Sequence, residues 1–142
     1  MEITEVDLAW AAGLFEGEGS VRINPVTDRN WGHLTASVTS IDADIVGFFH
    51  DRWGGYCKSV SVGPGRRPAF AWLIAARRAA AFLSQIQPYL RSERMREKVE
   101  WGLAFQAQKR LGARGEEYRA TQQQYAERMA ELNLRGLKER VS

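Results

Sequence analysis

The sequence predicts an α+β fold in which one antiparallel β-sheet carries helices on one face, with further helices at the C-terminal end. Three observations predict this fold. Four segments alternate apolar and polar residues with a period of two, which is typical of strands. Segments with helical spacing precede, separate and follow the two pairs of strands, and the chain beyond residue 92 has helical spacing only. The order is therefore α-β-β-α-β-β-α plus C-terminal helices, which leaves the other face of the sheet uncovered.

The first helix should begin near residue 5, because residues 4–7 (TEVD) fit the S/T-x-x-D/E capping box. Gly17 and Gly19 should end it. Glu16 and Glu18 then lie in the last turn, where the partial negative charge of the helix terminus disfavours each acid by roughly 0.3–1 kcal/mol. The position of these two acids calls for an explanation from outside the helix.

One face of this first helix consists of unusually small residues. Ala9, Ala12 and Gly13 form it, with Glu16 and Gly17 one turn further on. Such a stripe most often packs on the protein's own core. Here the opposite side, with Leu8, Trp10, Leu14 and Phe15, can fill the core instead. That arrangement frees the small face for a second helix, which another subunit can supply.

The four strands are expected at residues 20–24, 33–40, 56–62 and 69–75, with turns at 25–32 and 63–68. In the first pair the apolar side carries residues such as Val21 and Ile23. The other side carries hydrogen-bonding groups in place of the usual Lys and Glu mixture: Arg22, Asn24, His33, Thr35 and Ser37. Such a face is either simply solvated or a recognition surface.

The other helices are expected at residues 43–53, 76–87, 92–111 and 116–134. Asp42 is a candidate N-cap for the first of them, Gly54-Gly55 ends it, and Pro88 ends the next. The last helix is polar with a narrow apolar stripe. We therefore expect a core domain at 1–111 and a helical appendage at 112–142.

The net charge of +3 is unevenly distributed. Residues 1–20 hold five acids and no base, so residues 21–142 carry +8. The chain has sixteen Arg and four Lys; Arg suits bidentate contacts with phosphate and guanine, although a GC-rich genome explains the same bias. The single Cys57 excludes an internal disulfide and an all-Cys zinc site, and no run of about 18 apolar residues predicts a transmembrane helix. These features predict a cytoplasmic protein, bacterial or phage-encoded.

Residues 11–19, AAGLFEGEG, resemble the nine-residue motif of the LAGLIDADG homing endonucleases, with Glu at both acidic positions. The predicted element order is that family's core fold. Three further segments are similar to single-motif members: Val38-Thr39-Ser40, residues 82–90 (FLSQIQPYL), and Leu132-Asn133. The resemblance covers residues 5–111 well and the tail more loosely.

The resemblance implies a homodimer that pairs through the motif helices and cuts double-stranded DNA at a long, near-palindromic site. It implies that Glu18, with the backbone carbonyl of Gly17, holds Mg²⁺ between the two subunits and the scissile phosphates, whereas Glu16 has a structural role. Such an ion can activate water and stabilise the leaving oxygen. Mn²⁺ is the expected substitute, and Ca²⁺ is expected to bind without supporting cleavage. Ser40 matches a position where a polar side chain helps to position water.

The resemblance also implies that the uncovered sheet face is a DNA saddle, since a two-stranded ribbon fits the major groove. The candidates for base readout are the five polar residues of the first strand pair, Arg22, Asn24, His33, Thr35 and Ser37, together with Lys58 on the third strand. Ala71 and Leu73 fall at DNA-facing positions of the fourth strand. Arg66 and Arg67 in the basic turn suit phosphate contacts.

One departure from the family pattern concerns a Lys that many single-motif members carry after the QPYL-type segment. The matching residue here is Glu93, whose charge is wrong for stabilising phosphate, so either Arg94 or Arg91 substitutes or the activity is reduced. Two alternatives to a nuclease therefore stay open. One is a maturase or regulator that binds nucleic acid on the same fold without cleaving it. The other is a two-carboxylate glycoside hydrolase, for which the chain is short and lacks an aromatic-lined cleft signature.

Overall fold

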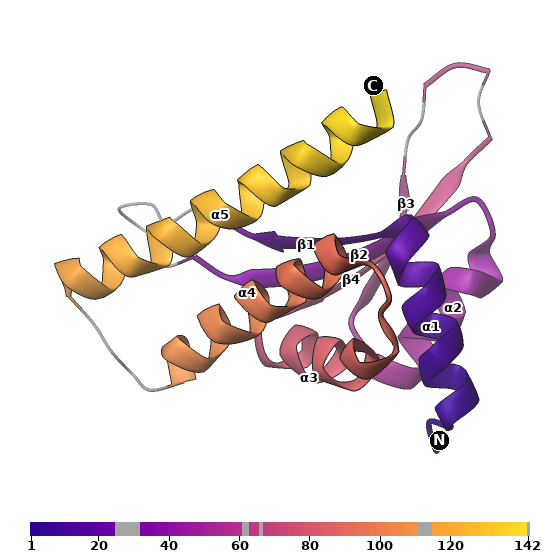
Figure 1. Ribbon diagram of the computed structural model, residues 1–142. Coiled ribbons are helices and arrows are strands. Elements are labelled where there is room, and N and C mark those ends of the chain that lie inside the picture. Colours follow the sequence, from indigo (N-terminus) through magenta and orange to yellow (C-terminus); the bar gives the residue numbers. More distant parts are fainter. Residues whose placement is uncertain (25–31, 61–62, 66, 111–114, 142) are drawn as a thin grey trace.

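The computed structural model describes residues 1–24, 32–60, 63–65, 67–110 and 115–141. A four-stranded antiparallel sheet with the order β1-β2-β4-β3 forms its centre, and helices α1 to α4 lie on one face of it (Figure 1). Helix α5 runs beside α4 and the edge strand β1 (Figure 1). The predicted α+β class and the predicted element order are confirmed.

The strands are β1 (Gly19–Ile23), β2 (Leu34–Ser40), β3 (Tyr56–Val60) and β4 (Ala69–Ala75). The helices are α1 (Glu5–Glu18), α2 (Ala43–Trp53), α3 (Ala76–Ile86), the short 3-10 helix η1 (Gln87–Tyr89), α4 (Glu93–Arg110) and α5 (Glu116–Val141). The bounds of α2 and β4 equal those predicted from the sequence. Helix α5 continues seven residues beyond the predicted end at 134. The predicted turn at 25–32 lies outside the described residues except for Gly32.

Local signals set the ends of the first two helices. Thr4 and Asp7 form the predicted capping box, in which each side chain accepts a hydrogen bond from the other residue's backbone N–H. At the end of α2, Gly54 and Gly55 both have positive φ, and a Cβ at Gly55 would lie 2.5 Å from the Leu73 carbonyl oxygen. Only glycine therefore allows this turn to approach β4 so closely.

The core between the sheet and the helices contains a cluster of aromatic rings. Phe49 of α2 stacks on Trp72 of β4 with ring centroids 5.0 Å apart, and Phe82 of α3 packs edge-on against Trp72 at the same distance. Phe15 of α1 meets Phe82 at 5.3 Å. All four rings are fully buried. Three helices are therefore fixed to the sheet through one set of ring contacts.

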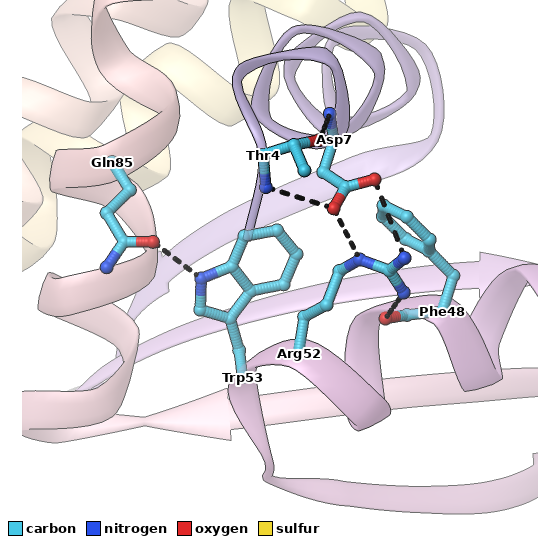
Figure 2. A network of polar contacts seen from close by, with 6 residues as sticks. All are labelled: Thr4, Asp7, Phe48, Arg52, Trp53 and Gln85. Atoms are coloured by element: carbon cyan, nitrogen blue, oxygen red, sulfur yellow. Dashed lines mark hydrogen bonds and ion pairs between the residues drawn. The ribbon is translucent and has the colours of Figure 1, made fainter. Parts of the chain in front are cut away.

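The N-terminal half of α1 is held to α2 by an ion pair. Arg52 of α2 contacts Asp7, with 3.2 Å between Nε and Oδ2, while its guanidinium also donates to the Phe48 carbonyl and lies 3.8 Å from the centre of the Phe48 ring (Figure 2). The pKa of Asp7 is lowered, first by the backbone N–H of Thr4 and then by Arg52. This network fixes the orientation of α1 at its start.

Helix α5 shares the core with the rest of the chain. Met129 and Leu132 are buried to 1% and 0% exposure, and Gln122 is buried as well. Arg128 donates to Glu97 of α4 over 2.7 Å. The predicted boundary between a core at 1–111 and an appendage at 112–142 stays a prediction, but Ala126 and Met129 of α5 belong to the same buried apolar cluster as residues before it.

A search of the described helices for a stretch both long and apolar enough to span a bilayer found none.

Candidate nucleic-acid interface and metal site

The sheet face opposite the helices is lined with polar side chains in the β1–β2 half. Val21 and Ile23 are buried, so their neighbours on β1 point to the open side. Arg22 is exposed and pairs across the strands with Thr35, and Ser20 pairs with Ser37. The structure thus brings three of the predicted base-reading residues, Arg22, Thr35 and Ser37, onto one surface.

The β3–β4 half of the open face carries fewer polar groups. Lys58 pairs with Ala71, which pairs in turn with Thr39 of β2, so the register places Lys58 on the open face. The sequence left the facing of this residue undecided. The same register places Tyr56 opposite Leu73 on this face, where 62% of Tyr56 is exposed. None of the four strands, as described here, contains an acidic residue.

Thr39 and Tyr56 are open-face residues that sequence reasoning did not select. Thr39 continues the alternation of Thr35 and Ser37, so the period-two pattern was a signal for it. Tyr56 stands two residues before Lys58, but β3 has no buried residue to reveal which side faces the helices.

Asn24 and His33 extend the β1–β2 ladder by one pair beyond the strands. The Asn24 N–H donates to the His33 carbonyl over 2.9 Å, and the side-chain nitrogens Asn24 Nδ2 and His33 Nε2 lie 2.5 Å apart. Gly32 directly precedes His33. Lys109, near the end of α4, donates from Nζ to the Gly32 carbonyl over 2.8 Å. Burial lowers the pKa of Lys109. Of the two predicted phosphate-contacting arginines, Arg67 is exposed just before β4, and Arg66 lies outside the described residues.

The two glutamates of the motif differ in their surroundings. Glu18 is the last residue of α1 and is exposed; within the described part of the chain, its carboxylate has no hydrogen-bond or ion-pair partner. The carbonyl of Gly17 is among the last of the helix, which have no partner within it. A Cβ at Gly19 would lie within 2.5 Å of Phe15, so glycine is needed where α1 turns into β1.

Glu16, by contrast, is engaged within the chain. Its two carboxylate oxygens accept hydrogen bonds from the backbone N–H groups of Arg91 (3.0 Å) and Ser92 (2.6 Å), directly before α4. The start of a helix carries partial positive charge, so α4 compensates the unfavourable position of this acid at the end of α1. The contact with the start of α4 therefore explains why an acid is present at the end of α1. It also fixes the C-terminal end of α1.

The same contact brings the first residues of α4 beside the motif. Glu93 occupies the first turn of α4, where a carboxylate interacts favourably with the helix dipole. Glu93 and Arg91 are exposed, and Arg94 is half-buried. Arg91 and Arg94, the two candidates to replace the family's lysine, therefore lie near the end of α1. Glu93 lies between them in the sequence.

Ser40, the predicted water-positioning residue, ends β2, whose Val38 pairs with Gly19 at the end of the motif. Its hydroxyl oxygen accepts a hydrogen bond from the Asp42 N–H over 3.0 Å. Asp42 is the N-cap of α2 as predicted, but its own side chain makes no capping bond. Ser40 therefore shapes the entry to α2, and its part in positioning water stays a prediction.

The exposed face of α1 differs in part from the predicted small face. Ala9 and Gly13 are exposed, as expected, but Ala12 is fully buried in the chain's own core, so we remove it from the face that a second helix could contact. Trp10, expected in the core, is 44% exposed and packs edge-on against Phe48. The exposed face consists of small and apolar residues along one stripe: Val6, Ala9, Trp10, Gly13 and Gly17.

A groove of about 540 Å³ lies between the β1 edge and α5. Arg22 and Asn24 line one side of it, and Gln123, Glu127 and Asn133 line the other. Asn133 donates from Nδ2 to the Val21 carbonyl over 3.0 Å, so α5 covers part of the β1 edge. Sequence reasoning noted Leu132-Asn133 as a similarity but did not place it at the sheet.

Among the described residues, no group of three or more His, Cys, Asp or Glu side chains could hold a metal ion. Each chain therefore offers Glu18 as one carboxylate at the motif end. Mg²⁺ is commonly bound by one or two carboxylates together with substrate phosphates and water, and the exposed Glu18 carboxylate fits such a donor set.

The sequence matches no protein-family model and no curated protein. The fold, however, is similar to solved homing endonucleases. The archaeal intron-encoded I-Vdi141I, complexed with DNA, aligns with a TM-score of 0.73 at 10% identity over 90% of this chain and 84% of that one. I-CvuI in complex with the I-CreI target, with Mg and uncleaved DNA, aligns with a TM-score of 0.72 at 14% identity over 90% and 82%.

Other alignments cover smaller shares of the matched chains. A second I-CvuI complex, determined with Ca, aligns at 15% identity with a TM-score of 0.60 over 72% of this chain and 66% of that one. The LAGLIDADG meganuclease I-AabMI, bound to uncleaved DNA, aligns at 16% identity with a TM-score of 0.59 over 74% of this chain and only 37% of that one. The protein thus has the LAGLIDADG homing endonuclease fold.

Proposed function

We propose that two copies of this chain form a metal-dependent endonuclease that cuts double-stranded DNA at a long, near-palindromic site. The observation that carries the proposal is the exposed Glu18 carboxylate, which has no partner among the described residues, at the end of a helix on which Ala9, Gly13 and Gly17 are also exposed. The homing endonucleases of this fold named above were solved with DNA, which supports DNA as the substrate.

The glycines of α1 support a second copy as the partner. Gly13 and Gly17 lie on the exposed face, and apart from the backbone of α1 itself no described atom comes within 4 Å of a Cβ built at either position. A helical glycine costs about 0.5–1 kcal/mol relative to alanine, and the single chain offers no reason for it. A closely approaching helix offers one. Val6 lies on the same stripe and is 77% exposed in the single chain, as expected of an apolar residue that a second subunit would cover.

The extent of the alignments agrees with a two-copy assembly. This chain spans more than four-fifths of I-Vdi141I and of the I-CvuI chain bound to the I-CreI target, but only 37% of I-AabMI and 40% of I-GzeII. A fold unit that forms most of some chains and less than half of others is expected where two such units act together.

In the proposed dimer, Glu18 and the Gly17 carbonyl of each chain would hold the divalent metal, whose chemistry there would be activation of water and stabilisation of the leaving oxygen. Glu16 keeps the start of α4, with Arg91 and Arg94, beside the motif. The guanidinium groups there supply positive charge toward the scissile phosphate, and Glu93 opposes it. The open sheet face binds the major groove, where Arg22 reads a base edge, while Arg67 contacts phosphate.

A second candidate function is nucleic-acid binding without cleavage on the same surfaces. The exposed carboxylate of Glu93, close to the motif end, favours it, because an acid there repels a scissile phosphate. This candidate predicts the same DNA binding and no cleavage with any divalent metal.

The test is a cleavage screen of a plasmid library with Mg²⁺ or Mn²⁺, and binding of the selected sites in Ca²⁺. We expect cleavage by the native chain, loss of cleavage with retained binding for Glu18→Gln, and no change for the matched control Glu100→Gln, an exposed acid in the middle of α4. Binding without cleavage by the native chain, together with cleavage gained by Glu93→Lys, would support the second candidate. Cleavage that survives in Glu18→Gln would refute the assignment of Glu18 to the metal.

A further inference from the structure

Asn24 and His33 are coupled residues on the open face. Their backbones pair directly, and two residues back the pair Arg22 and Thr35 faces the open side, so both side chains share that side. The 2.5 Å between Asn24 Nδ2 and His33 Nε2 joins the two side chains in one hydrogen bond. His33 is exposed and Asn24 half-buried, and Asn24 also lines the groove beside α5.

We propose that His33 orients the Asn24 carboxamide and that the oriented amide reads adenine, a claim that rests on the proposed DNA-binding function. In the proposed arrangement Asn24 Nδ2 donates to Nε2, which requires a lone pair on Nε2 and the ring proton on Nδ1. One amide hydrogen is used in this bond. The other amide hydrogen and Oδ1 are left, one donor and one acceptor. Adenine presents the complementary pair in the major groove, the N7 acceptor and the N6 donor.

The orientation decides what Asn24 presents to DNA. A half turn about the last side-chain bond exchanges the amide oxygen and nitrogen, so an unconstrained Asn offers both arrangements. The lone pair on His33 Nε2 accepts only the nitrogen end. His33 is itself held, because Asn24 N–H donates to its carbonyl and Lys109 fixes the preceding carbonyl of Gly32. His33 is thus a positioning residue, and Asn24 makes the base contact.

The first experiment selects a randomised double-stranded DNA library by binding to the full chain in Ca²⁺. We expect adenine over other bases by about 5- to 150-fold at one position in each half-site, and loss of this preference in Asn24→Ala. His33→Ala should lower the preference severalfold at that same position. His33→Gln, whose Oε1 accepts from the amide, should restore it. His50→Ala, a change of the exposed histidine of α2, is the matched control and should alter no position.

A result in which His33→Ala changes only a neighbouring base pair would overturn the proposal, because His33 would then read DNA itself. A preference other than adenine at the Asn24 position would overturn it as well.

The second experiment needs no DNA. Nitrogen-15 NMR of the free protein should show His33 with its proton on Nδ1. A proton on Nε2 would refute the orienting bond even if the protein binds DNA. An intact bond in a protein that binds no DNA would refute the proposed function, and adenine reading with it.

Discussion

Replacing Gly13 by alanine should raise the stability of a single chain and weaken its association with a second copy. Apart from the backbone of α1 itself, none of the atoms that the structure describes lies within 4 Å of the added Cβ, and the residue sits inside α1 without positive φ. The single chain should therefore gain the helix-propensity difference, about 0.5–1 kcal/mol. For a chain of this length the melting temperature should rise by roughly 2–5 °C.

The opposite sign is expected for association, because an added methyl group separates two helices that pack through glycine. Sedimentation velocity over a range of concentrations measures association, and thermal unfolding of dilute protein measures the chain's own stability. Gly47→Ala is the matched control: it is a helical glycine of α2 with the same open surroundings. It should raise the melting temperature equally and leave association unchanged.

If Gly13→Ala gave the same stability gain as Gly47→Ala and the same sedimentation behaviour as the native chain, the interface on α1 would be wrong. A native chain that sediments as a monomer at every concentration, both alone and with DNA, would refute it more directly.

Three further predictions concern stability. Glu16→Gln should lower the free energy of unfolding by about 1–3 kcal/mol in a denaturant titration, since one of two backbone N–H groups loses its acceptor. Asp7→Asn should lower stability at pH 7. Because the pKa of Asp7 is depressed, the stabilisation that ionised Asp7 provides is complete above about pH 4 and is lost as the pH falls through the lowered pKa. The free energies of unfolding of the native chain and of Asp7→Asn should therefore become equal in acid. Leu132→Ala should cost about 2–5 kcal/mol in a single unfolding transition; a separate transition for α5 would show that it is an appendage.

The sequence predicted most elements because their signals are local. The capping box, the Gly54-Gly55 turn and the alternation in β4 require only neighbouring residues, and the bounds of α2 and β4 follow them. The facing of Lys58 could not be predicted, because β3 is an edge strand without a buried residue and only its register with β4 fixes the side.

The side of α1 that faces the core was predicted only in part. Apolar residues surround this helix on almost every side, so spacing alone does not show that Ala12 is inside and Trp10 half outside. The partners of Glu16 lie 75 and 76 residues further along the chain. No local pattern reports such a contact, although the sequence did indicate that this acid needed one.

Helix α4 has contacts of different kinds at its two ends. Its start is bound to the motif through Glu16, and near its end Lys109 donates to the carbonyl of Gly32, two residues before β2. The helix between them is about 27 Å long, at 1.5 Å for each of its 18 residues. Helix α4 therefore connects the end of α1 that carries Glu18 to the residue just before His33. In the proposed endonuclease, the metal site and the base-reading end of the sheet would thus be joined by one helix of the same subunit.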